Sequence, residues 1–90
     1  MTDEELLTAV KSVLLISGEF HDAMLKIYIA EILDFLKSAG VPTSVLQSEK
    51  IVGIVSRGVS DLWNYGAGDG KLSQYFYQRT AQLTAETGAE

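Results

Sequence analysis

Hydrophobic residues recur every three or four positions through most of this chain, and this spacing predicts helices rather than strands. The first predicted helix starts at a capping box formed by Thr2 and Glu5 and runs to about Ile16, where Ser17 and Gly18 end it. Its apolar stripe consists of Leu6, Leu7, Val10, Val13 and Leu14. One face of this helix is therefore expected to be buried.

The second predicted helix begins between Phe20 and Asp22 and ends at Gly40, because Pro42 forbids its continuation. Apolar side chains cover roughly 240° of its circumference, which is more than one contact buries. Glu31 projects into this arc, so it either reaches water along its own stem or has a partner, for example in another subunit. The residues that we expect to contribute to subunit contacts are Tyr28, Ile29, Glu31 and Leu36.

The third predicted helix opens at Thr43 or Ser44 and runs to about Tyr65. It contains two glycines, each of which costs about 1 kcal/mol relative to alanine in the middle of a helix. Gly58 lies inside the apolar arc, so we interpret it as the site of a close approach by another helix. Gly53 lies on the polar side and has no such explanation.

A glycine-rich segment separates the third helix from a fourth, which Ser73 caps and whose apolar stripe ends at Leu83. Trp63 and Phe76, on either side of this segment, are expected to pack in the core. The loop expected to adjust to a neighbour comprises Gly66, Gly68, Asp69, Gly70 and Lys71. The sequence thus predicts an all-α fold, a small bundle of about four helices, with a single domain over residues 1–83 and a flexible tail over residues 84–90.

The composition of the chain argues against several classes of function. The net charge of -5 argues against a protein that grips nucleic acid or an anionic membrane by neutralising phosphates. The absence of cysteine and the single histidine leave no disulfide framework and no complete metal site. The start of the chain is acidic where a secretory signal would be basic, and no apolar run approaches the ~18 residues of a membrane span. We therefore expect a protein kept in a reducing, cytoplasm-like compartment.

Two short motifs depart from the patterns that their chemistry requires. The segment Gly66–Lys71 lacks the spacing of a phosphate loop, and Leu72 stands where such a loop has Ser or Thr. The triplet Ser60–Leu62 reverses the Asp-Ser-Leu that carries the prosthetic group of an acyl carrier protein, and it lies inside a predicted helix. Nucleotide binding and acyl carriage are both disfavoured.

Isolated polar residues have plain structural explanations. His21 beside Asp22 has no nucleophile to activate, so it is interpreted as a residue of a helix cap region. Arg57 and Asp61, one helical turn apart, are expected to form a surface ion pair worth under about 1 kcal/mol. A helix-turn-helix DNA reader is disfavoured because the connection between the third and fourth helices exceeds the usual length of about 3 to 4 residues. We find no catalytic constellation and expect no enzyme activity and no cofactor.

The segment RGVSDLWNYG (57–66), followed after the glycine loop by LSQYFYQR (72–79), resembles the C-terminal half of small head-tail connector proteins of tailed bacteriophages. The short acidic start, the apolar second helix with ILDFL (32–36) and the break at Val41 and Pro42 resemble these proteins too. The resemblance spans residues 1–83 and lies in the order, length and aromatic placement of the segments, since no single motif is diagnostic.

This resemblance implies a structural virion protein, many copies of which form a ring under the portal and continue the DNA channel toward the tail. The implied partners are further copies of the chain, in a ring expected to be dodecameric on the portal, together with the portal protein and the tail or a second connector. The implied location is the head-tail joint of the virion, and the host cytoplasm during assembly. DNA is expected to pass through the channel without specific binding, and no membrane is involved.

The physical pattern is compatible with this resemblance. An apolar arc of roughly 240° on the second helix would be buried laterally between identical neighbours in a ring. A negative charge repeated around a channel would repel DNA phosphates. The alternative is another acidic helical interaction module or regulator, monomeric or dimeric, that binds a protein partner. The mass of the purified protein, alone and with a portal protein, distinguishes these alternatives.

Overall fold

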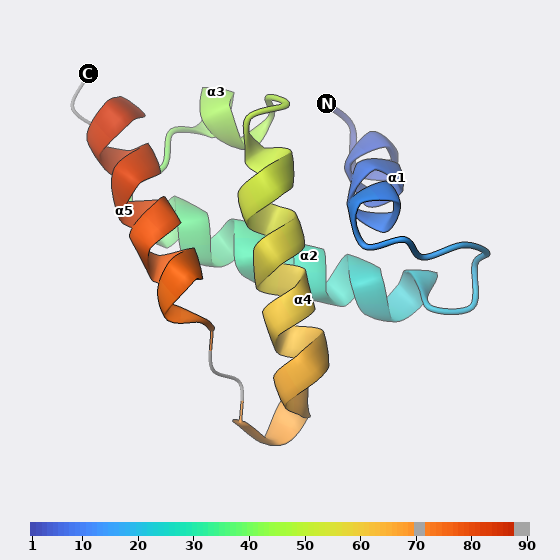
Figure 1. Cartoon of the computed structure of the whole chain (residues 1–90). Coiled ribbons are helices and arrows are strands. Elements are labelled where there is room, and N and C mark those ends of the chain that lie inside the picture. Colours follow the sequence, from blue (N-terminus) through green and yellow to red (C-terminus); the bar gives the residue numbers. More distant parts are fainter. Residues whose placement is uncertain (70–71, 88–90) are drawn as a thin grey trace.

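Helix α4 (Ile51–Asp69) is the element against which α1, α2 and α5 all pack in the computed structural model (Figure 1). The structure describes residues 1–69 and 72–87, and their side chains except those of residues 65–69, 86 and 87. The other helices are α1 (Asp3–Val13), α2 (Asp22–Ser38), α3 (Thr43–Leu46) and α5 (Gln74–Thr87). All regular structure in the described residues is helical, which confirms the predicted all-α class.

The core lies where α4 crosses α2, with α1 and α5 on opposite sides of α4 (Figure 1). α2 also contacts α1 and α3. The fully buried side chains include Val10, Leu25, Ile32, Leu36, Ile51, Val55, Val59 and Phe76. Every helix of at least eleven residues contributes to this core, so the described helices pack as one unit.

Gly58 permits the close approach of α4 to its neighbours. A Cβ atom at this position would lie 2.6 Å from Ile32 Cδ1 on α2 and 2.9 Å from Phe76 Cε2 on α5. Neither distance is compatible with a real side chain without a shift of the neighbours. The interpretation of Gly58 as a helix contact is confirmed. At Gly53 a Cβ would meet nothing within 4 Å, so that glycine serves no contact inside the chain.

The start of α1 is built as predicted. The amide of Glu5 donates to Thr2 Oγ1 at 3.1 Å, and the amide of Thr2 donates to Glu5 Oε1 at 2.8 Å, which completes a capping box. The end of α1 differs from the prediction, because the helix stops at Val13 rather than at Ile16. Leu15 adopts a φ of 59°, a left-handed conformation that interrupts a helix.

The single long helix predicted from Thr43 to Tyr65 is divided into α3 and α4. Both the amide and the hydroxyl of Ser48 donate to the carbonyl of Val45, at 3.0 and 2.8 Å. Bonds from a residue to the carbonyl three positions earlier tighten the last turn, and the hydroxyl competes for the carbonyl that a continuing helix would use. The chain therefore turns before α4 begins, and the described residues form five helices where four were expected.

The glycine-rich segment differs from the expected loop. α4 continues through Gly66 and Gly68 to Asp69, so these residues are helical, whereas Gly70 and Lys71 lie outside the described residues. The cap of α5 is confirmed, since Ser73 Oγ accepts from the amide of Phe76 at 3.1 Å.

α5 also extends further than predicted. It continues four residues past Leu83 to Thr87, in a segment expected to be a flexible tail. Thr84 is partly buried, and its methyl carbon lies 3.6 Å from the position that a Cβ of Gly40 would occupy. The expectation of a tail from residue 84 is therefore corrected for residues 84–87, because this turn packs beside the end of α2.

Candidate functional site

The four residues predicted for subunit contacts on α2 divide into two groups. Ile29 is only 7 % exposed and Leu36 is fully buried, so both belong to the core of the chain itself. Tyr28 is half-buried and Glu31 is exposed. The reason is that α1, α3 and α4 all pack on α2 and cover most of its apolar arc within one chain. This corrects the assignment of Ile29 and Leu36, while Tyr28 and Glu31 remain accessible to a neighbour.

The uncovered part of α2 is centred on Ile27, whose side chain is 66 % exposed. Glu31 and Asp34, one and two turns further along, are also exposed. Sequence reasoning placed Ile27 in the apolar arc but did not select it for the interface. The periodicity of the sequence predicts that Ile27 lies on the apolar side of the helix. It does not show that the neighbouring helices leave this one position uncovered.

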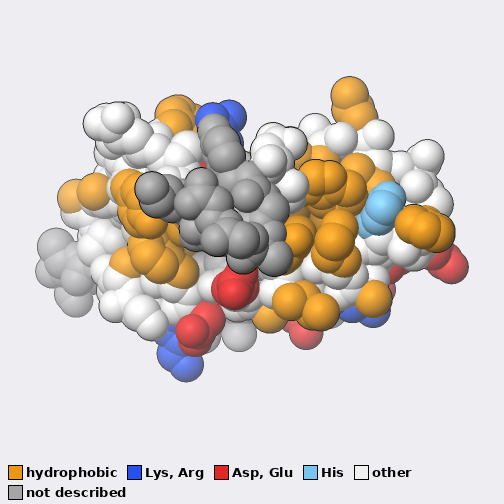
Figure 2. Space-filling view, turned by 90° about the horizontal axis from the view of Figure 1, so that it is seen from below, with side chains coloured by type: hydrophobic (Ala, Val, Ile, Leu, Met, Phe, Trp, Pro, Cys, Tyr) orange, Lys and Arg blue, Asp and Glu red, His pale blue; other side chains and the backbone are white. Residues whose placement is uncertain are grey.

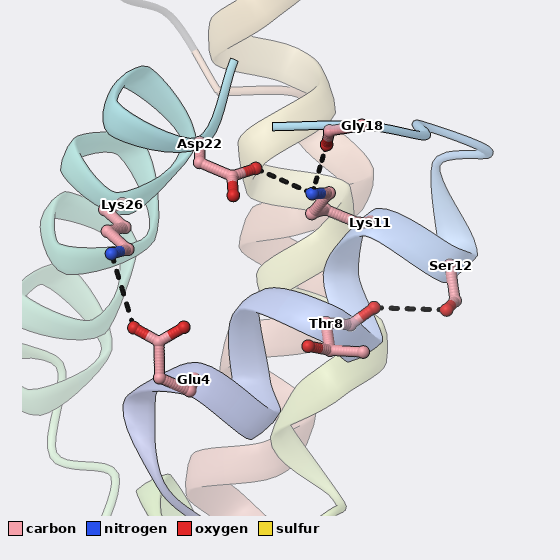
Figure 3. Close-up of polar contacts among 7 residues, drawn as sticks. All are labelled: Glu4, Thr8, Lys11, Ser12, Gly18, Asp22 and Lys26. Carbon is pink, nitrogen blue, oxygen red and sulfur yellow. Dashed lines mark hydrogen bonds and ion pairs between the residues drawn. The ribbon is translucent and has the colours of Figure 1, made fainter. Parts of the chain in front are cut away.

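Two cations join α1 to α2 and to the connection between these helices (Figure 3). Lys11 Nζ donates to the carbonyl of Gly18 and lies 2.7 Å from Asp22 Oδ1. Lys26 Nζ lies 3.3 Å from Glu4 Oε1. The Lys11 side chain is mostly buried, and its two contacts tie the middle of the connection and the first residue of α2 to α1. The Lys26 pair is exposed and contributes little.

The connection between α1 and α2 carries the two most exposed large apolar side chains that the structure describes. Leu15 is 92 % exposed and Phe20 is 91 % exposed. Leu15 also holds the left-handed φ of 59°, which is uncommon for any residue other than glycine. Clustered exposed apolar side chains mark interaction surfaces, so this connection is a candidate contact surface that the sequence reasoning missed. The only sequence signal was an apolar run that continues past the end of the helical stripe.

An aromatic group continues this surface toward α4. The His21 ring makes edge-to-face contacts with Phe20 at 4.8 Å and with Trp63 at 4.9 Å between ring centroids. Figure 2 shows hydrophobic side chains gathered beside this histidine. A shallow cavity of about 290 Å³ beside Trp63 is lined mainly by Leu14, Ile16 and Asn64. His21 thus packs between aromatic rings, which suits a contact surface better than acid-base chemistry.

Asp61 has a structural role that the sequence did not indicate. Its side chain is almost fully buried, its Oδ2 accepts from the amide of Ser73 at 3.0 Å, and its Oδ1 lies 3.5 Å from Arg57 Nε. The expected surface ion pair is therefore corrected, because the carboxylate is buried and only the arginine reaches solvent. Asp61 thus joins α4 to the capping residue of α5.

The two aromatic residues expected in the core differ in burial. Phe76 is fully buried as predicted, while Trp63 is half-buried at the edge of the core.

The described residues contain neither a candidate metal site nor a candidate membrane-spanning helix. Among the side chains that the structure describes, no group of three or more His, Asp or Glu residues could hold a metal ion. Over residues 1–69 and 72–87, no helix is long and apolar enough to cross a membrane. The features that stand out are the exposed apolar side chains of α2 and of the connection between α1 and α2.

Comparison with known proteins gave no match. No protein-family model, no curated protein and no solved structure matches the chain. The function is therefore inferred from the residues and contacts described above.

Proposed function

We propose that the protein is a structural subunit of the head-tail joint of a tailed bacteriophage, a connector that assembles as a ring under the portal. The ring joins the capsid vertex to the tail or to the next connector and continues the DNA channel. Its partners are further copies of the chain, in a ring proposed to be dodecameric, the portal protein, and the tail or second connector protein. The proposed role is mechanical, without catalysis and without a cofactor.

One observation carries this proposal: the folded chain leaves apolar side chains exposed on several separate surfaces. They are Leu15 and Phe20 on the connection between α1 and α2, Ile27 on α2, and Val13 with Tyr75 beside one groove on α4. A subunit of a ring that sits between two larger components has two lateral neighbours and further contacts along the channel axis. Separate apolar surfaces supply such contacts.

The charge of the chain supports the same role. A net charge of -5 per subunit, repeated around a ring, gives the channel a negative field that repels DNA phosphates. Genome DNA would then pass without adhering to the wall.

A second candidate is an acidic helical module that binds one protein partner as a monomer. The observation that favours it is the completeness of the core, since Leu25, Ile32 and Val59 are already fully buried within a single chain. In this case Leu15 and Phe20 alone would form the binding surface.

The test compares the purified full chain alone and with the portal protein encoded in the same genome, by native mass spectrometry and negative-stain electron microscopy. The connector proposal expects rings on the portal. A variant with Leu15→Ser and Phe20→Ser should keep its helical circular dichroism but bind portal more weakly, whereas Gln82→Ser, at an exposed position on α5, should bind normally. A chain that stays monomeric and never binds portal would overturn the proposal and favour the second candidate.

A further inference from the structure

A groove of about 320 Å³ lies on α4, on the side away from α2. Its lining includes Val13, Gly53, Ser56, Arg57, Ser60 and Tyr75. Gly53 is roughly 140° around the helix from Gly58, the glycine that contacts α2. Val13 and Tyr75 are each more than half exposed, so the groove has apolar walls that the chain itself does not cover.

Two polar groups in this groove lack the partners that they would normally have. Ser56 is buried, and its Oγ has no hydrogen-bond partner within the described part of the chain. Because Ser56 is only 1 % exposed, its hydroxyl lies beneath the surface of the groove, and the accessible polar group is that of Arg57. Arg57 faces Asp61 only through Nε and lies over the Tyr75 ring at 5.3 Å, with its side chain 49 % exposed. Since a guanidinium has five N–H donors, its outer edge remains available to a carboxylate.

The outer face of α2, formed by Ile27, Glu31 and Asp34, is complementary in charge to this groove. Ile27 lies roughly 140° around α2 from Ile32, which contacts Gly58 of α4. Glu31 and Asp34 beside it are exposed, and neither forms an ion pair within the residues that the structure describes. Ile27 and Glu31 are one helical turn apart, which is also the spacing of Gly53 and Arg57 in the groove.

We propose that the outer face of α2 in one copy of the chain docks in the α4 groove of the next copy, with Ile27 over Gly53 and Glu31 facing Arg57. Charge complementarity selects this occupant, because an acidic helix face meets the exposed arginine of the groove. Gly53 has no Cβ and leaves open space, so a branched side chain approaches the helix backbone closely. The inference rests on the proposed ring, for which it names the two lateral faces.

The two faces differ and lie on opposite sides of the chain, so the contact is heterologous. Each copy uses its α2 toward one neighbour and its α4 groove toward the other. A contact of this type closes into a ring when the rotation between neighbours allows it.

The first test is cross-linking, which is straightforward because the chain has no cysteine. A disulfide requires two Cβ atoms within about 4.5 Å. Chains with Ile27→Cys mixed with chains with Gly53→Cys should form a mixed disulfide about tenfold faster than either variant alone. The control pair is Thr8→Cys with Gln82→Cys, which are exposed on α1 and α5 and are not among the residues that line the groove or form the outer face of α2. Equal rates for the test and control pairs, with or without portal, would overturn the inference.

The second test reverses the charges. Arg57→Glu and Glu31→Arg should each weaken self-association at least about tenfold in sedimentation velocity, and the double variant should recover to within about threefold of the wild type. The matched control is Glu49→Arg, an exposed acid of the turn before α4. Ile27→Asp tests the same contact without touching the Arg57 and Asp61 pair, and it should also weaken association about tenfold.

The outcomes separate the inference from the proposed function. Rings on the portal that are unaffected by Arg57→Glu, Glu31→Arg and Ile27→Asp would overturn the inference and leave the connector proposal in place. A chain that never self-associates, alone or on the portal, would overturn both. Inorganic phosphate that shifts the Ser56 and Arg57 amide signals of a permanent monomer would assign the groove to an anion and likewise overturn the inference.

Discussion

Asp61 Oδ2 accepts a hydrogen bond from the amide of Ser73 at 3.0 Å, across the connection between α4 and α5. Ser73 in turn caps α5 through its own hydroxyl, so one buried carboxylate positions the residue at which the next helix begins.

Asp61→Ala is expected to lower the free energy of unfolding by about 2 to 3 kcal/mol, because it removes a charge-assisted hydrogen bond and leaves the Ser73 amide without its acceptor. Asp61→Asn keeps one carbonyl oxygen and should cost less. Urea unfolding followed by circular dichroism measures both. Glu49→Ala, at an exposed acid, should change stability by less than about 0.5 kcal/mol. A loss equal to that of this control would show that the Asp61 bond is dispensable.

Gly58→Ala is expected to destabilise the fold by about 1 to 3 kcal/mol, because the new methyl group would overlap Ile32 and Phe76. Gly53→Ala has open space and should instead stabilise α4 by about 0.5 to 1 kcal/mol by reducing the freedom of the unfolded chain. Both variants are compared by urea unfolding at protein concentrations too low for self-association. Stabilisation by both substitutions would contradict the close packing at Gly58.

Ile29 and Ile27, two positions apart on α2, should respond in opposite ways. Ile29→Ala is expected to cost about 2 to 5 kcal/mol of stability, because the side chain is buried in the core. Ile27→Ala should change stability by less than about 0.5 kcal/mol. Ile29 was expected at a subunit contact from the sequence, but its burial predicts that Ile29→Asp prevents folding. Thermal unfolding of the two alanine variants measures this difference in stability. Equal melting temperatures would contradict the assignment of Ile29 to the core and Ile27 to the surface.

The capping box predicts a dependence of stability on pH. The hydrogen bond from the Thr2 amide, followed by the interaction with the Thr2 hydroxyl, lowers the pKa of Glu5 below its ordinary value of 4.5. Because the folded pKa is the lower one, the stabilisation is fully present above the unfolded value of 4.5 and is lost as the pH falls through the folded pKa.

Glu5→Gln should therefore remove part of the loss of stability seen between neutral and acidic pH. Urea unfolding at about pH 7 and about pH 3 measures it, and NMR titration of the Glu5 carboxyl gives the pKa directly. Glu49→Gln serves as the control, since this exposed acid lies outside the cap. An identical pH profile for wild type and Glu5→Gln would rule out this contribution.

Local signals in the sequence were sufficient for the caps at Thr2 and Ser73 and for Gly58, but the starts of α2 and α3 have no side-chain cap. The pairing of Thr2 with Glu5, the cap at Ser73 and the close approach at Gly58 depend on neighbours in sequence or on a side of a helix that periodicity reveals. The break at Ser48 was missed because a serine hydroxyl either points to solvent or binds a carbonyl, and the sequence does not show which.

Burial was harder to predict than secondary structure. The wide apolar arc of α2 indicated more contact than one helix provides, but it did not show that three helices of the same chain supply that contact. Ile29 and Leu36 were therefore assigned to an interface, while Ile27 was overlooked. Likewise, the burial of Asp61 follows from the return of α5 along α4, a tertiary event with no local signal.

The contacts of Lys11 with the connection between α1 and α2 lower the entropic cost of binding a partner there. A free loop must be ordered when a partner binds, at about 1 to 2 kcal/mol for each residue fixed. Here the Lys11 contacts tie Gly18, in the middle of the connection, and Asp22, the first residue of α2, to α1 in the unbound chain. Leu15 and Phe20 are thus presented in a preorganised arrangement, so a partner would meet a surface that is already close to its bound shape.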